Sequence, residues 1–479
     1  MAKIAENVIY NVALTLSTFL INLVLFPYVS RVLGVDYVGK IGFVNNVITY
    51  FSLFSLWGIR SLGIREIAAC GNDAQKRSEV FSSLLGFLII ATSFVTIIYI
   101  LAVFTVPRFR VDHSLLIIGS ISLFFTSFLI EWFYQGMENF KYITIRNVVI
   151  RIIYAVLVFF LINSPDNYLL YFGLTVAVVL VNAAINLIYS RNFVRFSIKA
   201  INIKQYMKPL FSLGLYNIVL SMYTTFNVIY LGFVCTDTEV GYYYTSTKIY
   251  QIIIGFVSAF TGVMMPRISN LLNTHQELEA NAKIKKSIEL MLFVSIPLAI
   301  FFFCMAPHVV SLISGAGYEG AVMPMRIIMP IIIVASLAQI WVIQILIPRK
   351  KDNVVLISAT IGAVVGITAN LLLVKSLGAV GSAIVLLLSE LCGNTYSLIY
   401  AIKHHYLEFP KDLIRQIIPY SLIFIVICVT TMFINNIYSL FACLLICTVF
   451  FYVYHTTIFR NGVIGGYIVM LQNKVFRKS

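Results

Sequence analysis

The sequence has few charged residues. Asp, Glu, Lys and Arg make up 11% of its 479 residues, and 60% of the residues are hydrophobic. Soluble proteins carry roughly 25% charged residues, which cover their water-facing surface. Intrinsic disorder requires the opposite composition, with low hydrophobicity and high charge. The shortage of charge therefore excludes a soluble globular protein and a disordered one. It predicts an all-α polytopic membrane protein, whose apolar surface faces lipid.

Motifs for catalysis and metal binding are also absent. The chain contains no HExxH, GxSxG or CxxC sequence. Its seven cysteines form no regular framework, and most lie in apolar stretches, so we expect them to pack as small hydrophobic side chains. Residues 34–41, GVDYVGKI, approach a P-loop but end in Ile where Ser or Thr would hold Mg²⁺. We therefore expect a transporter and not an enzyme, with no metal, no cofactor and no ATP.

Long apolar stretches dominate the chain. A stretch of about 20 apolar residues crosses a bilayer as a helix. The first stretch lacks a signal-peptide cleavage site, so it counts as a span. The sequence contains fourteen such stretches. If one pair of neighbouring stretches does not cross the membrane, twelve spans remain, and both termini still lie on the same side of the membrane. The predicted spans are residues 8–29, 41–59, 80–104, 114–134, 144–163, 168–190, 210–234, 242–265, 288–306, 325–347, 354–374, 380–401, 416–435 and 439–459.

The net charge of +15 is distributed unevenly over the connections between these spans. Of the 34 Lys and Arg residues, 27 lie in connections on the same side as both termini, and five lie on the other side. The positive-inside rule therefore places the N- and C-termini in the cytoplasm. The basic residues are scattered over many short loops, which argues against nucleic-acid binding.

A short Val-Gly pattern recurs at the predicted outer end of three spans. It stands at Val38-Gly39, Val240-Gly241 and Val380-Gly381. The first two glycines are 202 residues, or six predicted spans, apart, and an even offset predicts a parallel repeat. Transporters are often built from such repeats, with the substrate between the halves.

The repeat predicts three domains. Residues 1–200 and 201–402 would each form a six-helix bundle, and residues 403–479 would add a helix pair and a tail. The basic segment 191–209 marks the boundary between the bundles. It predicts either an amphipathic helix on the inner leaflet or an ordinary solvated loop.

Polar residues follow one helical face of the first span of each half. Their spacing, three or four residues in the first span and seven, four and three residues in the seventh, places them on a common side of each helix. They either line a water-filled cleft or form hydrogen bonds between helices. They are Asn7, Asn11, Thr15, Thr18 and Asn22 in the first span, and Tyr216, Tyr223, Asn227 and Tyr230 in the seventh.

Charged residues inside the predicted spans are few. Lys248 and Arg151 each lie about seven residues into a span, whereas Arg31 and Arg326 lie near outer ends. Cations that face a cleft would attract an anionic headgroup such as phosphate. Glu390, near the middle of a span, is a candidate for binding H⁺ or Na⁺, with a salt bridge to a basic residue as the alternative.

Several sequence blocks resemble bacterial repeat-unit flippases of the Wzx type. These flippases form the polysaccharide-transport branch of the multidrug/oligosaccharidyl-lipid/polysaccharide (MOP) exporter superfamily. The resemblance covers nearly the whole chain in order. Its blocks include PYVSRVLGVDYVGKIGF (27–43), EWFYQGMENFKYITIRN (131–147), LGFVCTDTEVGYYYTSTKI (231–249) and ILIPRKKDN (345–353).

The resemblance implies a MATE-like fold with two six-helix bundles related by a pseudo-two-fold axis. It implies a bacterial inner-membrane flippase that moves undecaprenyl-diphosphate-linked oligosaccharides from the cytoplasmic to the periplasmic leaflet by alternating access, with polysaccharide polymerases as partners. Glu131 would then be a conformational or coupling residue at the inner gate, and Glu390 would match an acidic position of the family in the span 380–401, also for coupling or gating. The coupling ion is left open. The cationic cleft would contain Arg31, Lys40, Arg151, Lys248 and Arg326.

Two other functions remain as alternatives. A small-molecule or multidrug antiporter of the same superfamily would favour an acidic cleft, and Glu131 and Glu390 are the acidic residues within spans apart from Glu289, the second residue of its span. A membrane-embedded polysaccharide polymerase would need a sizeable outer loop, and the predicted outer loops have mostly about 5–15 residues. The sequence leaves open whether the pathway is that of O-antigen, capsule or exopolysaccharide.

Overall fold

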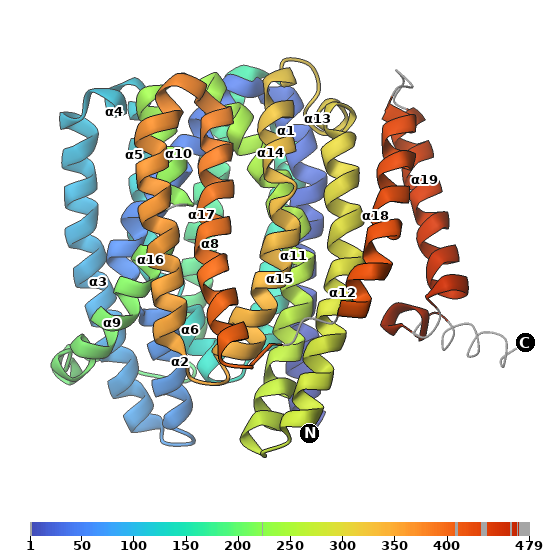
Figure 1. The fold of residues 1–479 in the computed structure, drawn as a ribbon. Helices are drawn as coiled ribbons and strands as arrows, with labels where there is room; N and C mark the ends of the chain where they lie inside the picture. Colours follow the sequence, from blue (N-terminus) through green and yellow to red (C-terminus); the bar gives the residue numbers. More distant parts are fainter. Residues whose placement is uncertain are drawn as a thin grey trace, which may run out of the picture. The chain divides into compact units, whose positions relative to one another are not determined.

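Every regular element in the described part of the chain is a helix (Figure 1). The computed structural model describes residues 2–222, 224–407, 411–432, 438–459, 462–466 and 468. This confirms the predicted all-α class. Backbone groups in lipid have no water to bond, and a helix satisfies them within one segment.

Backbone contacts divide the chain into two compact units. The first comprises Met1–Tyr244 with Gly366–Ser382, and the second comprises Thr245–Val365 with Ala383–Ser479. The predicted organisation into 1–200, 201–402 and 403–479 stays a prediction.

The first unit begins with the longest helix, α1. Its helices are α1 (Ala2–Leu56), α2 (Ile59–Ala69), α3 (Ala74–Thr105), α4 (Pro107–Val111), α5 (His113–Phe125), α6 (Glu131–Gly136), α7 (Phe140–Leu161), α8 (Tyr168–Ser190), α9 (Lys204–Ser221) and α10 (Thr225–Val234).

The second unit contains most of the remaining helices. Three helices, α11, α16 and α17, run through the boundaries between the units. The helices after α10 are α11 (Asp237–Asn273), α12 (Glu277–Cys304), α13 (Ala306–Ser314), α14 (Val322–Ile328), α15 (Ile331–Gln339), α16 (Asp352–Ala369), α17 (Lys375–Lys403), α18 (Lys411–Met432) and α19 (Tyr438–Val453).

The described residues contain ten helices long and apolar enough to cross a membrane, or eleven if one bent pair counts as a span. Two of them, Ala13–Leu56 and Asp352–Lys403, are 44 and 52 residues long, about twice what a bilayer requires. Each contains a non-helical glycine, Gly34 with φ 77° or Gly378 with φ 53°. Each therefore accounts for two predicted spans joined at a glycine instead of a loop. The predicted span 210–234 is divided between α9 and α10.

Residues 191–203 of the basic segment 191–209 form a loop, and residues 204–209 begin α9. Its only regular structure before Lys204 is one 3₁₀ turn, Ile198–Ala200. Two serines of α3 accept hydrogen bonds from the backbone of this loop. The amide of Ser197 donates to Ser82 Oγ at 3.0 Å, and the amide of Asn202 donates to Ser83 Oγ at 3.0 Å. These hydrogen bonds fix the linker against α3.

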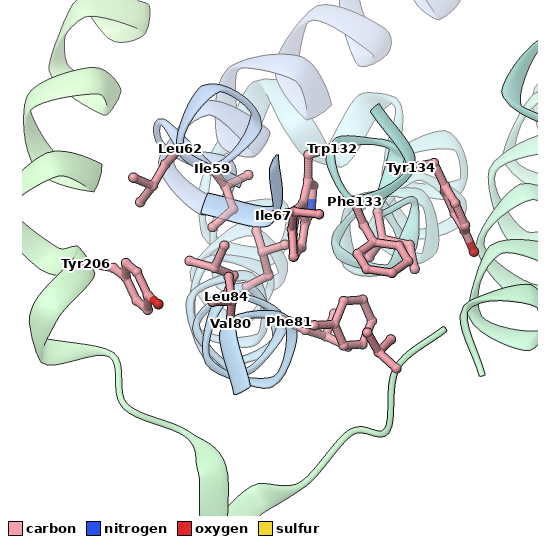
Figure 2. Close-up of a cluster of buried hydrophobic side chains, with 14 of the residues drawn as sticks. Ile59, Leu62, Ile67, Val80, Phe81, Leu84, Trp132, Phe133, Tyr134 and Tyr206 are labelled. Atoms are coloured by element: carbon pink, nitrogen blue, oxygen red, sulfur yellow. The ribbon is translucent and has the colours of Figure 1, made fainter. Parts of the chain in front are cut away.

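A buried cluster of aromatic and aliphatic side chains joins α2, α3, α6 and the start of α9 (Figure 2). Trp132 and Phe133 of α6 lie against Phe81 of α3, with 5.0 Å between the ring centroids of Phe81 and Phe133. Gly63 of α2 lies so close to the Trp132 ring that a β-carbon there would overlap it. The absence of a side chain at Gly63 therefore sets the spacing of α2 and α6.

We expect Gly63→Ala to destabilise the protein by about 1–3 kcal/mol, because the added methyl group overpacks the cluster. Gly173→Ala is the matched control. A β-carbon at Gly173 meets no atom within 4 Å, and alanine favours a helix over glycine. The thermal unfolding midpoint in detergent should fall for Gly63→Ala and stay constant or rise for Gly173→Ala. Equal midpoints for the two variants would contradict the close packing of α2 on α6.

Candidate functional site

Arg151 of α7 reaches the polar face of α1. Its guanidinium donates a hydrogen bond to the hydroxyl of Thr18, and Thr18 in turn donates to the carbonyl of Leu14 at 2.8 Å. Both side chains are half-buried. The structure thus brings together a predicted cleft cation and a predicted lining residue, from helices more than 130 residues apart in the sequence.

Glu131, the first residue of α6, forms an ion pair with Arg146 of α7. Nη2 of Arg146 donates to Oε1 of Glu131 at 2.7 Å, and the amide of Asn147 donates to the same oxygen at 3.1 Å. The Arg146 side chain is 4% exposed, and its guanidinium lies 5.4 Å from the Tyr142 ring. Glu131, the predicted gating residue, is therefore already paired in this structure.

Asn186 of α8 connects this ion pair to two tyrosines. Its carboxamide oxygen accepts from Arg146 and from the Tyr142 hydroxyl at 3.0 Å. Its backbone carbonyl accepts from the Tyr134 hydroxyl at 2.5 Å. The sequence interpretation missed Arg146 and Asn186, because Arg146 was counted with the loop cations. The spacing of Tyr142 and Arg146, four residues apart on one helical face, was the signal available.

The remaining predicted cations are divided between the two units. Arg31 is exposed and Lys40 lies 5.6 Å from the Tyr37 ring, both in the first unit. Lys248 of α11 and Arg326 of α14 are half-buried in the second unit. Their assembly around one cleft stays a prediction.

The predicted polar faces have mixed environments. Thr18 and Tyr230 are half-buried, and Asn22 is exposed. Asn227 does not line an open cleft. It is fully buried, and its amide nitrogen donates to the Tyr243 hydroxyl and to the carbonyl of Ser382, each at 2.9 Å. An asparagine surrounded by apolar helices gains most from such interhelical bonds. The side chains that lie outside the described residues are Asn7, Asn11, Tyr216 and Tyr223.

Glu390 is half-buried on α17. Its carboxylate accepts a hydrogen bond from the amide of Asn394 at 2.7 Å. Within the described residues, no basic side chain lies at ion-pair distance from it. The alternative of a salt bridge therefore finds no support in that part of the chain.

The three Val-Gly segments meet in the first unit, where residues 35–41, 236–241 and 377–381 form what we term the three-turn junction. A β-carbon at Gly39 would overlap the carbonyl of Asp237, and one at Gly241 would overlap the carbonyl of Val35. Two hydrogen bonds complete the junction. Thr238 Oγ1 donates to Asp36 at 2.6 Å, and the amide of Ala379 donates to Glu239 at 2.6 Å.

Arg108 of α4 braces this junction. Its Nε donates to the carbonyl of Gly232 at 2.7 Å, and its guanidinium pairs with Asp112 at 2.8 Å and with Asp237. The Asp112 side chain is 2% exposed. Burial raises the pKa of Asp112, and the positive charge of Arg108 opposes that rise.

An apolar pocket of about 490 Å³ lies among α1, α3 and α9. Phe51 and Phe54 of α1 line one side, together with Trp57 directly after the end of this helix. Phe87 and Phe94 of α3 face them. A pocket lined in this way suits a hydrocarbon chain and excludes a charged group.

Similar proteins are membrane transporters. Two relatives named "Putative O-antigen transporter" match most of the chain. The one from Escherichia coli (strain K12) is 25% identical over 396 residues, which is 81% of this chain and 94% of the relative. The one from Shigella dysenteriae is 24% identical over 393 residues, which is 78% of this chain and 94% of the relative.

Solved structures show the same fold. The lipid II flippase MurJ in an inward closed conformation has a TM-score of 0.76 at 15% identity, covering 95% of this chain and 99% of its own. An inward-facing MATE family multidrug resistance transporter of the MOP superfamily has a TM-score of 0.62 at 13% identity, covering 84% of this chain and 96% of its own. The predicted MATE-like fold is thereby confirmed.

The family model described as "Polysaccharide biosynthesis protein" matches residues 4–272, more than half of the chain. Together with the O-antigen transporter relatives, this match confirms the resemblance to Wzx-type proteins. The apolar helices and these relatives identify a multi-pass protein of the bacterial inner membrane. The chain belongs to the polysaccharide biosynthesis protein family.

Proposed function

We propose that this protein is a flippase for surface polysaccharide biosynthesis. It moves undecaprenyl-diphosphate-linked oligosaccharide repeat units from the cytoplasmic to the periplasmic leaflet by alternating access. The family match, the O-antigen transporter relatives and a fold shared with a lipid II flippase support the proposal. A polymerase that joins the delivered repeat units is the expected partner.

The observation that carries the proposal is the excess positive charge on α7. Arg146 and Arg151 lie on this helix, and within the described residues only Glu131 offers an ion pair to either of them. The cluster therefore has a net charge of +1. A cation held among apolar helices is costly unless it has a functional role. A diphosphate headgroup carries the complementary charge, and guanidinium groups bind phosphate oxygens well.

The lipid tail requires a different environment from the headgroup. A polyprenyl chain is apolar and must remain in hydrocarbon while the headgroup crosses. The aromatic pocket among α1, α3 and α9 has the apolar lining that such a chain needs. We assign this pocket to the lipid part of the substrate.

The second candidate is an ion-coupled multidrug antiporter, because a multidrug resistance transporter shares the fold. An organic cation would require an unpaired acidic site. Glu131 is engaged by Arg146, which leaves Glu390 as the acidic group of the two predicted from the sequence. The electrostatics of α7 therefore favour an anionic substrate.

Transfer of a lipid-diphosphate-linked oligosaccharide between leaflets of proteoliposomes tests the proposal. We expect Arg151→Gln to lower the transfer rate by about tenfold or more, because it removes a charge-assisted hydrogen bond. Lys248→Ala tests a second predicted cation in the same assay. Arg110→Gln is the matched control, since Arg110 is exposed and donates to its neighbouring Phe104 carbonyl.

The outcomes separate the two functions. If Arg151→Gln transfers at the wild-type rate, the flippase stands but the cationic site on α7 is wrong. If wild type moves no lipid-linked sugar from several donors and exports an organic cation, the antiporter replaces the flippase.

Glu390 is our candidate for ion coupling. In proteoliposomes with an imposed H⁺ or Na⁺ gradient, we expect the gradient to accelerate wild-type transfer and to have no effect on Glu390→Gln. Glu277→Gln is the control, because Glu277 is exposed at the start of α12. A Glu390→Gln variant that still responds to the gradient would remove Glu390 from the coupling step.

Arg108 braces the three-turn junction through Asp112, Asp237 and the carbonyl of Gly232. We expect Arg108→Gln to destabilise the protein by about 3–5 kcal/mol, because it leaves the buried carboxylate of Asp112 and the half-buried carboxylate of Asp237 unpaired. The pKa of Asp112 is raised in the folded protein, so folding disfavours its ionised carboxylate. The free energy of unfolding therefore decreases as the pH rises above the ordinary pKa of an aspartate. The loss of thermal stability should therefore be larger at pH 8 than at pH 5.

A double-mutant cycle tests whether the loss of the Arg108–Asp237 ion pair causes this destabilisation. Asp237→Asn added to Arg108→Gln should cost less than the sum of the single changes, because it removes a charge that Arg108 no longer neutralises. Strictly additive losses, or a pH-independent loss for Arg108→Gln, would show that the Arg108–Asp237 pair does not brace the junction.

A further inference from the structure

Three buried cysteines of the second unit form a compact triangle. Cys428 lies on α18, and Cys443 and Cys447 lie one turn apart on α19 (Figure 1). The Sγ–Sγ distances are 3.7 Å for Cys443–Cys428, 3.8 Å for Cys428–Cys447 and 3.9 Å for Cys443–Cys447. Packing as separate small hydrophobic residues does not require such a triangle.

These distances match the edge of a metal-thiolate tetrahedron. A Zn–S bond is about 2.3 Å, so two sulfurs of a regular tetrahedron lie about 3.8 Å apart. An ion bonded to all three sulfurs would lie about 0.8 Å out of their plane, with its fourth position open. Hydrogen-bonded thiols have similar spacing. The surroundings of the triangle therefore decide between a metal site and a cluster of hydrogen-bonded thiols.

Two further donors lie next to the triangle. The thiol of Cys304, the last residue of α12, interacts with the thiol of Cys428. His308 of α13 interacts electrostatically with Cys443, and its Nδ1 is buried with no hydrogen-bond partner in the described part of the chain. A buried nitrogen without a partner is costly, and coordination would satisfy it. Both groups carry donor atoms of the kind that the fourth position takes, a thiolate sulfur or an imidazole nitrogen.

The local charge also suits bound thiolates. Each thiol loses its proton when it binds a metal, so three cysteines and a divalent ion leave one negative charge. Arg326 of α14 interacts electrostatically with Cys304 and would offset that charge. Thiolate sulfur is a soft ligand that selects ions such as Zn²⁺ and Cu⁺ over Mg²⁺ or Ca²⁺.

We propose that Cys428, Cys443 and Cys447 bind one thiophilic metal ion, Zn²⁺ or Cu⁺, with Cys304 or His308 as a further ligand. The ion would tie α19 to α18, and through Cys304 or His308 to the preceding helices of the second unit. This site is independent of the proposed flippase function.

The test uses the full-length protein, purified in detergent with a non-chelating reductant. After dialysis against Zn²⁺ or Cu⁺, elemental analysis should find one ion per chain, and the two metals in separate arms identify the one preferred. Cys443→Ser/Cys447→Ser should lower metal affinity by at least about 100-fold, since it removes two ligands. Cys235→Ser/Cys392→Ser is the matched control, because it removes two cysteines outside the cluster.

A second measurement uses wild type alone, in case the double variant does not fold. Bound Zn²⁺ should protect Cys428, Cys443 and Cys447 from alkylation, as read by peptide mass spectrometry, and a chelator should remove that protection. The proposal is overturned if wild type retains neither metal. It is equally overturned if the double variant retains as much metal as the control, or if protein purified without reductant contains a disulfide among these cysteines.

Discussion

The constraint on which the structure depends is that no polar group inside a bilayer can turn to water for a hydrogen bond. The helices satisfy the backbone, and side chains must find partners across helices. Asn227 illustrates the result: it is fully buried, yet its amide bonds two groups on neighbouring helices. The same requirement explains why Glu131, Arg146 and Asn186 form one connected network and not three separate polar residues.

Functional charges depend on this network. An isolated cation inside a membrane span costs free energy. Arg151 lies next to the Thr18 hydroxyl of α1 and on the same helix as Arg146, which is paired with Glu131. The arrangement keeps positive charge available for an anion, while Glu131, Asn147 and Asn186 are engaged with one another or with Arg146. The apolar pocket among α1, α3 and α9 supplies the opposite environment within the same unit. A substrate with a charged head and a hydrocarbon tail needs both environments.

Hydropathy predicted the membrane class and the position of most helices, because lipid imposes a uniform cost along the chain. It failed where one residue changes the chain direction. Gly34 and Gly378 interrupt continuous helices, and the apolar pattern around them predicted loops. The Val-Gly segments were recognised as a repeat, but their meeting at one junction depends on packing between distant segments. Arg146 was assigned to a loop because its partners, Glu131 and Asn186, lie on other elements.

The three-turn junction has a consequence for the energy metabolism of the membrane. Where Gly39 and Gly241 bring backbone against backbone, even a methyl group has no room, so a water molecule has none either. A chain of waters through a transporter would conduct protons and dissipate the gradient that the inner membrane maintains. The two glycines exclude water without any side chain that could rotate away. The same contact that shortens the distance between helices thus keeps a proton-conducting chain of waters from passing between these two segments.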